Sequence, residues 1–122
     1  MQLATKINFK SKFDKFHEQW SPKIIAEMND YQFKLVKIKN DFMWHQHHDT
    51  DEVFIVIEGK ISIEFENETI EINEGEMIVV PKGKKHRPFA KKEAKIMLIE
   101  PRGVVNTGNI ENELTAPSDQ WI

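Results

Sequence analysis

Four side chains that can bind a metal ion occur in two short stretches of this sequence. The first stretch, W-H-Q-H-H-D-T-D-E, contains His45 and His47, and Glu52 follows His47 after four residues. The second stretch, P-K-G-K-K-H-R-P, contains His86. Imidazole nitrogens and carboxylate oxygens suit divalent first-row metals, so three histidines and one glutamate make a good ligand set.

The spacing of these residues predicts that their side chains share one space. Side chains two residues apart on a strand point to the same face, so His45 and His47 should point together and His48 away. Glu52 begins the apolar run V-F-I-V-I, and His86 comes just after the turn that ends M-I-V-V-P. We therefore predict one site for a divalent transition metal (Fe, Mn, Ni or Zn), with the ligands His45, His47, Glu52 and His86.

The neighbours of the ligand set predict an apolar pocket with few charges. Met43 shares the parity of the two histidines and Phe54 that of Glu52, so both should line the pocket, unless they are plain barrel core. Two arginines are the candidates for binding an anionic substrate: Arg87, beside His86, and Arg102, after the last predicted strand. The candidate substrate-binding residues are thus Met43, Phe54, Arg87 and Arg102, and the candidate catalytic residue is Glu52.

The composition narrows the class of protein. The 122 residues fit one domain (1–122), and 39% hydrophobic residues suffice for a core. The absence of cysteine excludes thiolate chemistry, and a net charge of −3 argues against a nucleic-acid partner. The apolar runs are too short to cross a membrane, and the first ten residues do not read as a signal peptide. We expect a cytoplasmic protein with no membrane partner.

Hydrophobic periodicity divides the chain into three parts. A stripe of Phe9, Phe13, Phe16 and Trp20 recurs at helical steps, which predicts a helix in residues 8–28 that is interrupted at Ser21-Pro22. Residues 31–100 contain many short alternating or apolar runs separated by turns, typical of an all-β sandwich or barrel. A change of parity between Leu35 and Val36 suggests a bulge. The predicted parts are a helical segment (1–30), a barrel (31–100) and an irregular tail (101–122).

The two motifs resemble those of the cupin superfamily. The first reads H-x-H-x4-E-x6-G, from His45 to Gly59, and the second reads G-x5-P-x-G-x2-H, from Gly75 to His86. The resemblance covers about residues 31–100, and it implies a jelly-roll barrel with a short N-terminal helix whose metal is bound by the four residues named above. The W-S-P step and the PRGVVNTG tail are similar to short bacterial cupins often labelled mannose-6-phosphate isomerase-like.

Two classes of function fit these expectations. The first is a metal-dependent enzyme of the isomerase, dioxygenase or lyase type that acts on a sugar-like or enolisable carbonyl substrate at open coordination positions. The alternative is a non-catalytic module that binds a sugar or a small acid. A barrel of this size exposes sheet edges and apolar outer faces, so we also expect a homodimer.

Overall fold

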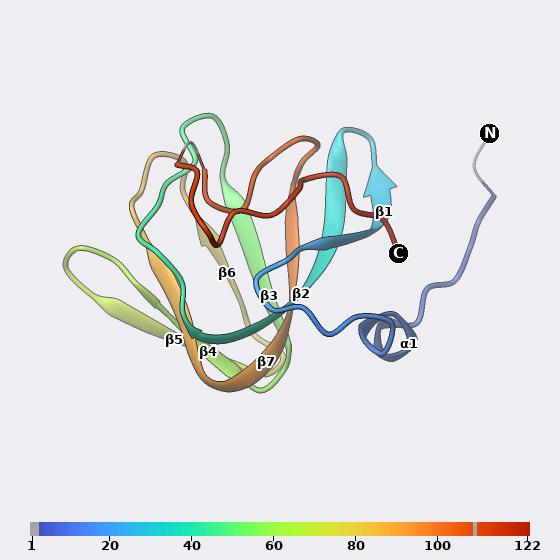
Figure 1. Cartoon of the computed structure of the whole chain (residues 1–122), viewed down its shortest axis with the longest axis horizontal. Helices are drawn as coiled ribbons and strands as arrows, with labels where there is room; N and C mark the ends of the chain where they lie inside the picture. The colour runs from blue at the N-terminus through green and yellow to red at the C-terminus, as the bar shows by residue number, and fades with distance from the viewer. Residues whose placement is uncertain (1–2, 109) are drawn as a thin grey trace.

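The computed structural model describes residues 3–108 and 110–122, which form a barrel of antiparallel strands with one short helix (Figure 1). In the sheet the strands follow the order β1-β2-β7-β3-β6, and β4 pairs with both β5 and β7. This arrangement is the jelly-roll barrel that the sequence predicted. The elements are α1 (Phe9–Phe13), β1 (Lys23–Met28), β2 (Tyr31–Asp41), β3 (Glu52–Glu58), β4 (Lys60–Glu64), β5 (Thr69–Asn73), β6 (Met77–Val80) and β7 (Arg87–Pro101).

The long strand β7 closes the barrel. Its first residues pair with β4, and its later residues lie between β2 and β3. Figure 1 shows β7 curving beneath the barrel as it passes from one group of strands to the other. Because β7 pairs with β4 near its start and with β2 and β3 further along, residues from both of its ends can face the barrel interior.

Both faces of the β2–β7–β3 sheet are apolar. Side chains from alternate positions fill the barrel interior, including Val36, Ile38, Phe54, Ile96 and Leu98. The other parity points outward to a second cluster, which contains Phe13, Phe16, Ile25, Leu35 and Met97. Antiparallel sheets commonly leave one face to solvent, so a second apolar face calls for a cover.

The helix predicted over residues 8–28 is wrong beyond Phe13. Only Phe9–Phe13 is helical, and residues 23–28 form strand β1, which pairs with β2. The aromatic stripe splits because Phe13 and Phe16 pack in the outer cluster while Trp20 packs against the interior cluster. One straight helix could not place aromatic rings in both, so tertiary packing overrides the local periodicity.

The bulge predicted at Leu35 and Val36 is also displaced. Both residues are buried because β2 is covered on both faces, so the change of parity needs no bulge. The register of β2 against β7 instead shifts between Ile38 and Asn40, and Asn40 has a φ of 66°. Asparagine tolerates this left-handed conformation better than most residues.

The C-terminal tail lies across one end of the barrel (Figure 1). The Asn106 side chain donates to the carbonyl oxygens of Trp20 and Leu114, each at 2.9 Å, and accepts from the Ala116 N–H at 2.9 Å. The bond to Trp20 holds the tail to the segment before β1, and the other two fold the tail on itself. Among the described residues, no helix is long and apolar enough to cross a membrane.

Candidate metal centre

The four predicted ligands converge inside the barrel. His45 lies on a β-bridge with His86, Glu52 is the first residue of β3, and His86 immediately precedes β7. All four side chains are buried, and they offer ligand atoms that lie within 4.8 Å of one another. His48 is exposed, as the strand parity predicted, and Trp44 is exposed as well.

Backbone carbonyls orient two of the imidazoles. The Nδ1 atom of His45 is 3.0 Å from the Met43 carbonyl oxygen, and the Nδ1 atom of His86 is 2.9 Å from that of Lys84. A carbonyl can only accept, so each Nδ1 carries a proton, and in the neutral ring Nε2 presents a lone pair to the site. Such outer contacts fix the tautomer of metal-binding histidines.

The inward atoms of the site lack hydrogen-bond partners. The Nε2 atoms of His47 and His86 lie 3.3 and 3.6 Å from Oε1 of Glu52. None of these three buried atoms has a hydrogen-bonding partner in the described structure. Leaving such atoms unpaired is costly, so the arrangement fits a cation bound between them.

The ionisation of the site also suits a metal. Burial and the charge of neighbouring His86 lower the pKa of His45 to about 4, so this imidazole is neutral at pH 7. Burial opposes ionisation of Glu52, but the His47 and His86 rings outweigh it and hold the pKa of that carboxyl well below its usual range. A neutral imidazole and an ionised carboxylate are the forms that bind metals.

An apolar cavity adjoins the ligands. It measures about 30 Å³, and its lining includes Phe54, Leu98, His45 and Glu52. The Phe54 ring meets the His86 ring edge-on, with centroids 6.1 Å apart. Met43 is half-buried; its carbonyl orients His45, and its sulfur contacts Asn112 in the tail. The substrate-binding roles of Phe54 and Met43 remain predictions.

The two candidate arginines lie in different places. The Arg87 guanidinium binds Glu64 at 2.7 Å and lies over the Trp44 ring, 5.6 Å from its centroid. Arg102 lines a cavity of about 350 Å³ at the barrel mouth, together with His47. Its Nε binds Glu27 at 2.9 Å, which neutralises much of its charge. A role for either arginine in substrate binding remains a prediction.

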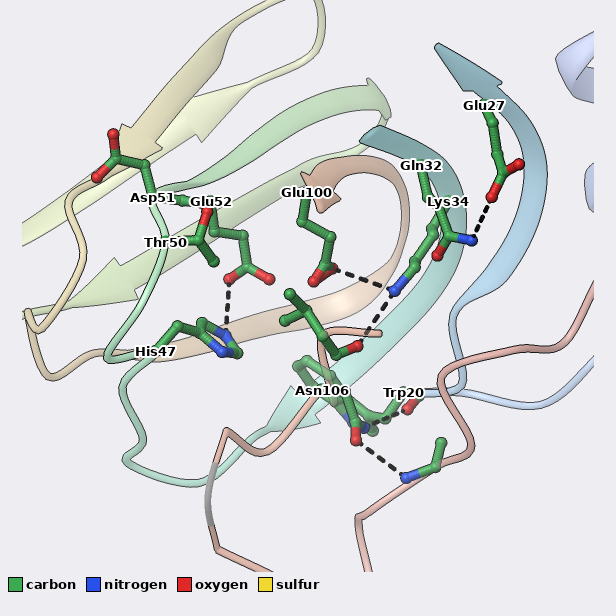
Figure 2. Close-up of polar contacts among 12 residues, drawn as sticks. Trp20, Glu27, Gln32, Lys34, His47, Thr50, Asp51, Glu52, Glu100 and Asn106 are labelled. Carbon is green, nitrogen blue, oxygen red and sulfur yellow. Dashed lines mark hydrogen bonds and ion pairs between the residues drawn. The ribbon is translucent and has the colours of Figure 1, made fainter. Parts of the chain in front are cut away.

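Three buried polar residues near the site were not singled out from the sequence. Gln32 and Lys34 of β2 and Glu100 of β7 point into the barrel, and Figure 2 shows Glu100 between Glu52 and Lys34. Burial raises the pKa of the Glu100 carboxyl well above its usual range, and the Glu52 carboxylate adds to the rise. Lys34 shares the parity of Val36 and Ile38, so strand periodicity could have indicated its burial. The aromatic residues at 31 and 33 have the other parity, and they favoured the opposite face of β2 as the buried one.

Comparison with known proteins supports this architecture. The model of the Cupin domain family matches residues 34–109, which is more than half of the chain. The chain belongs to the cupin family. The match includes all four candidate ligands of this cupin, from His45 to His86.

Solved structures of related proteins share the fold of this cupin. A cupin-2 domain containing protein from Shewanella frigidimarina NCIMB 400 is 60% identical with a TM-score of 0.78, over 79% of this chain and 94% of that one. Protein NMB1881 from Neisseria meningitidis is 37% identical with a TM-score of 0.74, over 80% and 99%. The Bacillus subtilis (strain 168) protein named Uncharacterized protein YdbB is 39% identical over 64 residues, 52% of this chain and 57% of that protein.

Proposed function

We propose that this cupin binds one divalent transition metal through His45, His47, Glu52 and His86 and acts on a small polar molecule at that metal. The observation that supports this most directly is the group of buried ring and carboxylate atoms without partners. A bound metal would supply Lewis-acid activation and a template for substrate oxygens. Six-coordinate binding leaves two positions beyond the four protein ligands, which suits an isomerase, dioxygenase or lyase acting on a sugar-like or enolisable carbonyl substrate.

The residues of the chain prepare the site for this role. Glu52 stays ionised and sets the negative charge of the ligand set, so it is the candidate catalytic residue. His45 and His86 are held by backbone carbonyls, so their rings need little reorganisation. Apolar neighbours such as Phe54 keep water from the interior. Preorganised polar groups in a dry cavity are the usual basis of metal-assisted catalysis.

Metal content tests the ligand assignment. Wild-type protein purified from its own host should contain near one transition metal per chain by elemental analysis. His47→Ala should lose most of it, because His47 supplies one of the four ligands. His48→Ala is the matched control, since it removes an exposed imidazole one residue away and should retain the metal. Full metal content in His47→Ala would refute the site.

Turnover separates the enzyme from the non-catalytic binding module. Metal-loaded protein should be incubated in D₂O with a panel of aldoses, ketoses and hydroxy ketones, both in air and without oxygen, and followed by NMR. We expect deuterium incorporation or product with at least one of them, reduced at least tenfold in Glu52→Gln. Glu58→Gln, an exposed change on the same strand, is the control. Binding without conversion under either atmosphere would favour the module that binds a sugar or a small acid.

We further propose that this cupin is a homodimer that works in the cytoplasm. The apolar outer face supports the dimer, because α1 and the following turn cover only part of it. Met77 and Val79 on the edge strand β6 remain about half exposed, at 56% and 49%. Exposed apolar side chains on an edge strand are a common site of association. Cell fractionation of the native host checks the location.

A further inference from the structure

Three polar side chains form a cluster inside the barrel beside the proposed metal centre. Gln32 and Lys34 lie on β2 and Glu100 lies on β7, with exposed fractions of 3%, 1% and 1%. Gln32 and Glu100 are direct partners in the antiparallel pairing of these strands. Apart from the candidate ligands, the cluster is surrounded by the hydrocarbon side chains of the interior, so it needs compensating hydrogen bonds.

The contacts of the cluster leave two oxygen atoms free. The Gln32 amide nitrogen donates to Glu27 at 2.8 Å, which fixes the amide and leaves its oxygen Oε1 as an acceptor. The Lys34 ammonium donates to the Val104 carbonyl at 3.2 Å and lies 3.8 Å from Oε1 of Glu100. Oε1 of Gln32 and Oε2 of Glu100 are buried and have no hydrogen-bond partner in the described structure.

The cluster lies between the metal centre and Val104 of the tail. Figure 2 shows the Glu100 carboxyl facing both Glu52 on one side and Lys34 on the other. Val104, which accepts the Lys34 hydrogen bond, lines the mouth cavity of about 350 Å³ together with the candidate ligand His47. Because the Glu100 carboxyl faces Glu52, a second oxygen of a molecule held at the centre would meet Glu100 as its nearest polar neighbour in the cluster.

We propose that Gln32, Lys34 and Glu100 form a subsite for the hydroxyl groups of an uncharged polyhydroxy ligand. This inference rests on the proposed function, because it places another oxygen of the same ligand at the metal. The cluster would select the ligand by its hydroxyl groups, and the metal would bind one of its oxygens.

Hydroxyl groups fit the free atoms of the cluster. The Gln32 oxygen needs a donor, and a hydroxyl supplies one. A hydroxyl can also accept, so it suits the Glu100 carboxyl in either protonation state. Sites built to hydrogen-bond a substrate hydroxyl reject analogues that lack it, because the buried partners are then left unpaired.

A negatively charged ligand does not fit the cluster. Carboxylate and phosphate oxygens only accept hydrogen bonds, so they would oppose the Gln32 oxygen. The Lys34 ammonium already donates to the Val104 carbonyl at 3.2 Å beside Glu100, and the Arg102 guanidinium is paired with Glu27 at 2.9 Å. Glu52 adds a further carboxyl group to the same space, as Figure 2 shows.

Paired probes of one carbon skeleton test this inference. Protein loaded with Co²⁺ should be titrated calorimetrically with xylitol, D-xylose and D-xylonate, and the visible Co²⁺ spectrum should be followed in parallel. We expect xylitol or D-xylose to bind and to shift the spectrum, and D-xylonate to bind at least tenfold more weakly. No binding of either neutral probe at 50 mM, which would mean that water alone occupies the cluster, overturns the inference. Equal binding of D-xylonate also overturns it.

Two variants separate the subsite from the metal centre. Gln32→Leu should weaken binding of the neutral probe about tenfold while Co²⁺ content and spectrum stay unchanged, because Gln32 is not a candidate ligand. Glu100→Gln keeps hydrogen-bonding capacity and should bind the neutral probe within threefold of wild type. Gln19→Leu, an exposed change, is the control. Unaltered probe binding in a folded Gln32→Leu protein contradicts the subsite.

The outcomes distinguish failure of the subsite from failure of the proposed function. Absence of stoichiometric Co²⁺ in wild-type protein refutes the metal centre itself. Stoichiometric Co²⁺ without preference for the neutral probe refutes only the subsite. If Gln32→Leu does not fold, the wild-type comparison of xylitol with D-xylonate still decides between the two results.

Discussion

His45 and His86 exchange both of their backbone hydrogen bonds, although they lie far apart in the sequence. The N–H of His45 donates to the His86 carbonyl at 3.0 Å, and the N–H of His86 donates back at 2.9 Å. Their ring centroids are 4.2 Å apart. The separation of these two imidazoles is thus fixed by a β-bridge, so the polypeptide itself brings half of the ligand set together.

We expect the stability of the metal-free protein to fall in mild acid because of His45. The ordinary pKa of 6.5 is lowered to about 4 in the folded state, chiefly by burial. Between these values the unfolded chain binds a proton that the folded chain does not, so the contribution is complete above pH 6.5 and is lost as pH falls towards 4. The difference amounts to about 3 kcal/mol at its largest.

Urea unfolding in the presence of a chelator at pH 4.5, 5.5 and 6.5 measures this dependence. In His45→Gln the part of the slope that belongs to His45 should disappear, whereas His17→Gln removes an exposed imidazole and should keep the wild-type slope. Identical slopes for wild type and His45→Gln would show that burial of this ring does not govern the acid response.

Gly108 should be needed to seat the tail on the barrel. Its φ is +69°, and a Cβ atom at this position would collide with the Gln46 carbonyl oxygen. Gly108→Ala should therefore lower the free energy of unfolding by about 3 kcal/mol, since a clash adds to left-handed strain. Gly103→Ala, at a φ of +89° with nothing within 4 Å, should cost only the strain, about 1 kcal/mol. Equal losses in chemical denaturation would contradict the close contact.

A charge on the edge strand should dissociate the proposed dimer. Light scattering at micromolar concentration should give about twice 14.4 kDa for wild type. Val79→Glu should give the monomer mass, because burying an unpaired carboxylate in an apolar interface is costly. Thr69→Glu, on the exposed strand β5, should leave the mass unchanged. A wild-type particle of 14.4 kDa would rule out this assembly.

The aromatic residues near the N-terminus should differ sharply in their effect on stability. Phe16 is 3% exposed and packs in the outer cluster, so Phe16→Ala should lower the free energy of unfolding by about 3–5 kcal/mol. Phe9 is 40% exposed, and Phe9→Ala should change it by no more than about 0.5 kcal/mol. Thermal and chemical unfolding of both variants give the comparison, and similar losses would indicate that Phe9 packs as closely as Phe16.

Local pattern predicted an all-β sandwich or barrel, and the two motifs, through their resemblance to cupins, predicted the jelly roll and the four converging side chains. Strand parity was enough to place His45 and His47 on one face and His48 on the other. Helical periodicity, in contrast, gave a wrong prediction where two packing surfaces compete for neighbouring residues. Phe13 and Trp20 share a helical period but pack against opposite sides of the sheet, and only the closed barrel shows this.

The inner polar cluster was missed for a related reason. Lys34 carries a charge, and buried lysines are rare, so the pattern favoured the aromatic face of β2 as the buried one. Its burial depends on Glu100, which lies on a distant strand, and on Val104 in the tail. Strand parity places Lys34 on the face of Val36 and Ile38, but its pairing with Glu100 and Val104 is set by tertiary structure.

The pairing of β7 with β2, β3 and β4 has a consequence for when the proposed metal site can form. During synthesis the first three candidate ligands emerge from the ribosome before residues 87–101. Residues 87–101 form β7, which pairs with β2, β3 and β4. The nascent chain therefore has no assembled site to load, since a preformed site rarely exists before folding. The proposed metal would therefore load only after β7 has paired with its partners, so its identity would reflect the ions available to the folded protein as well as the preferences of the ligands.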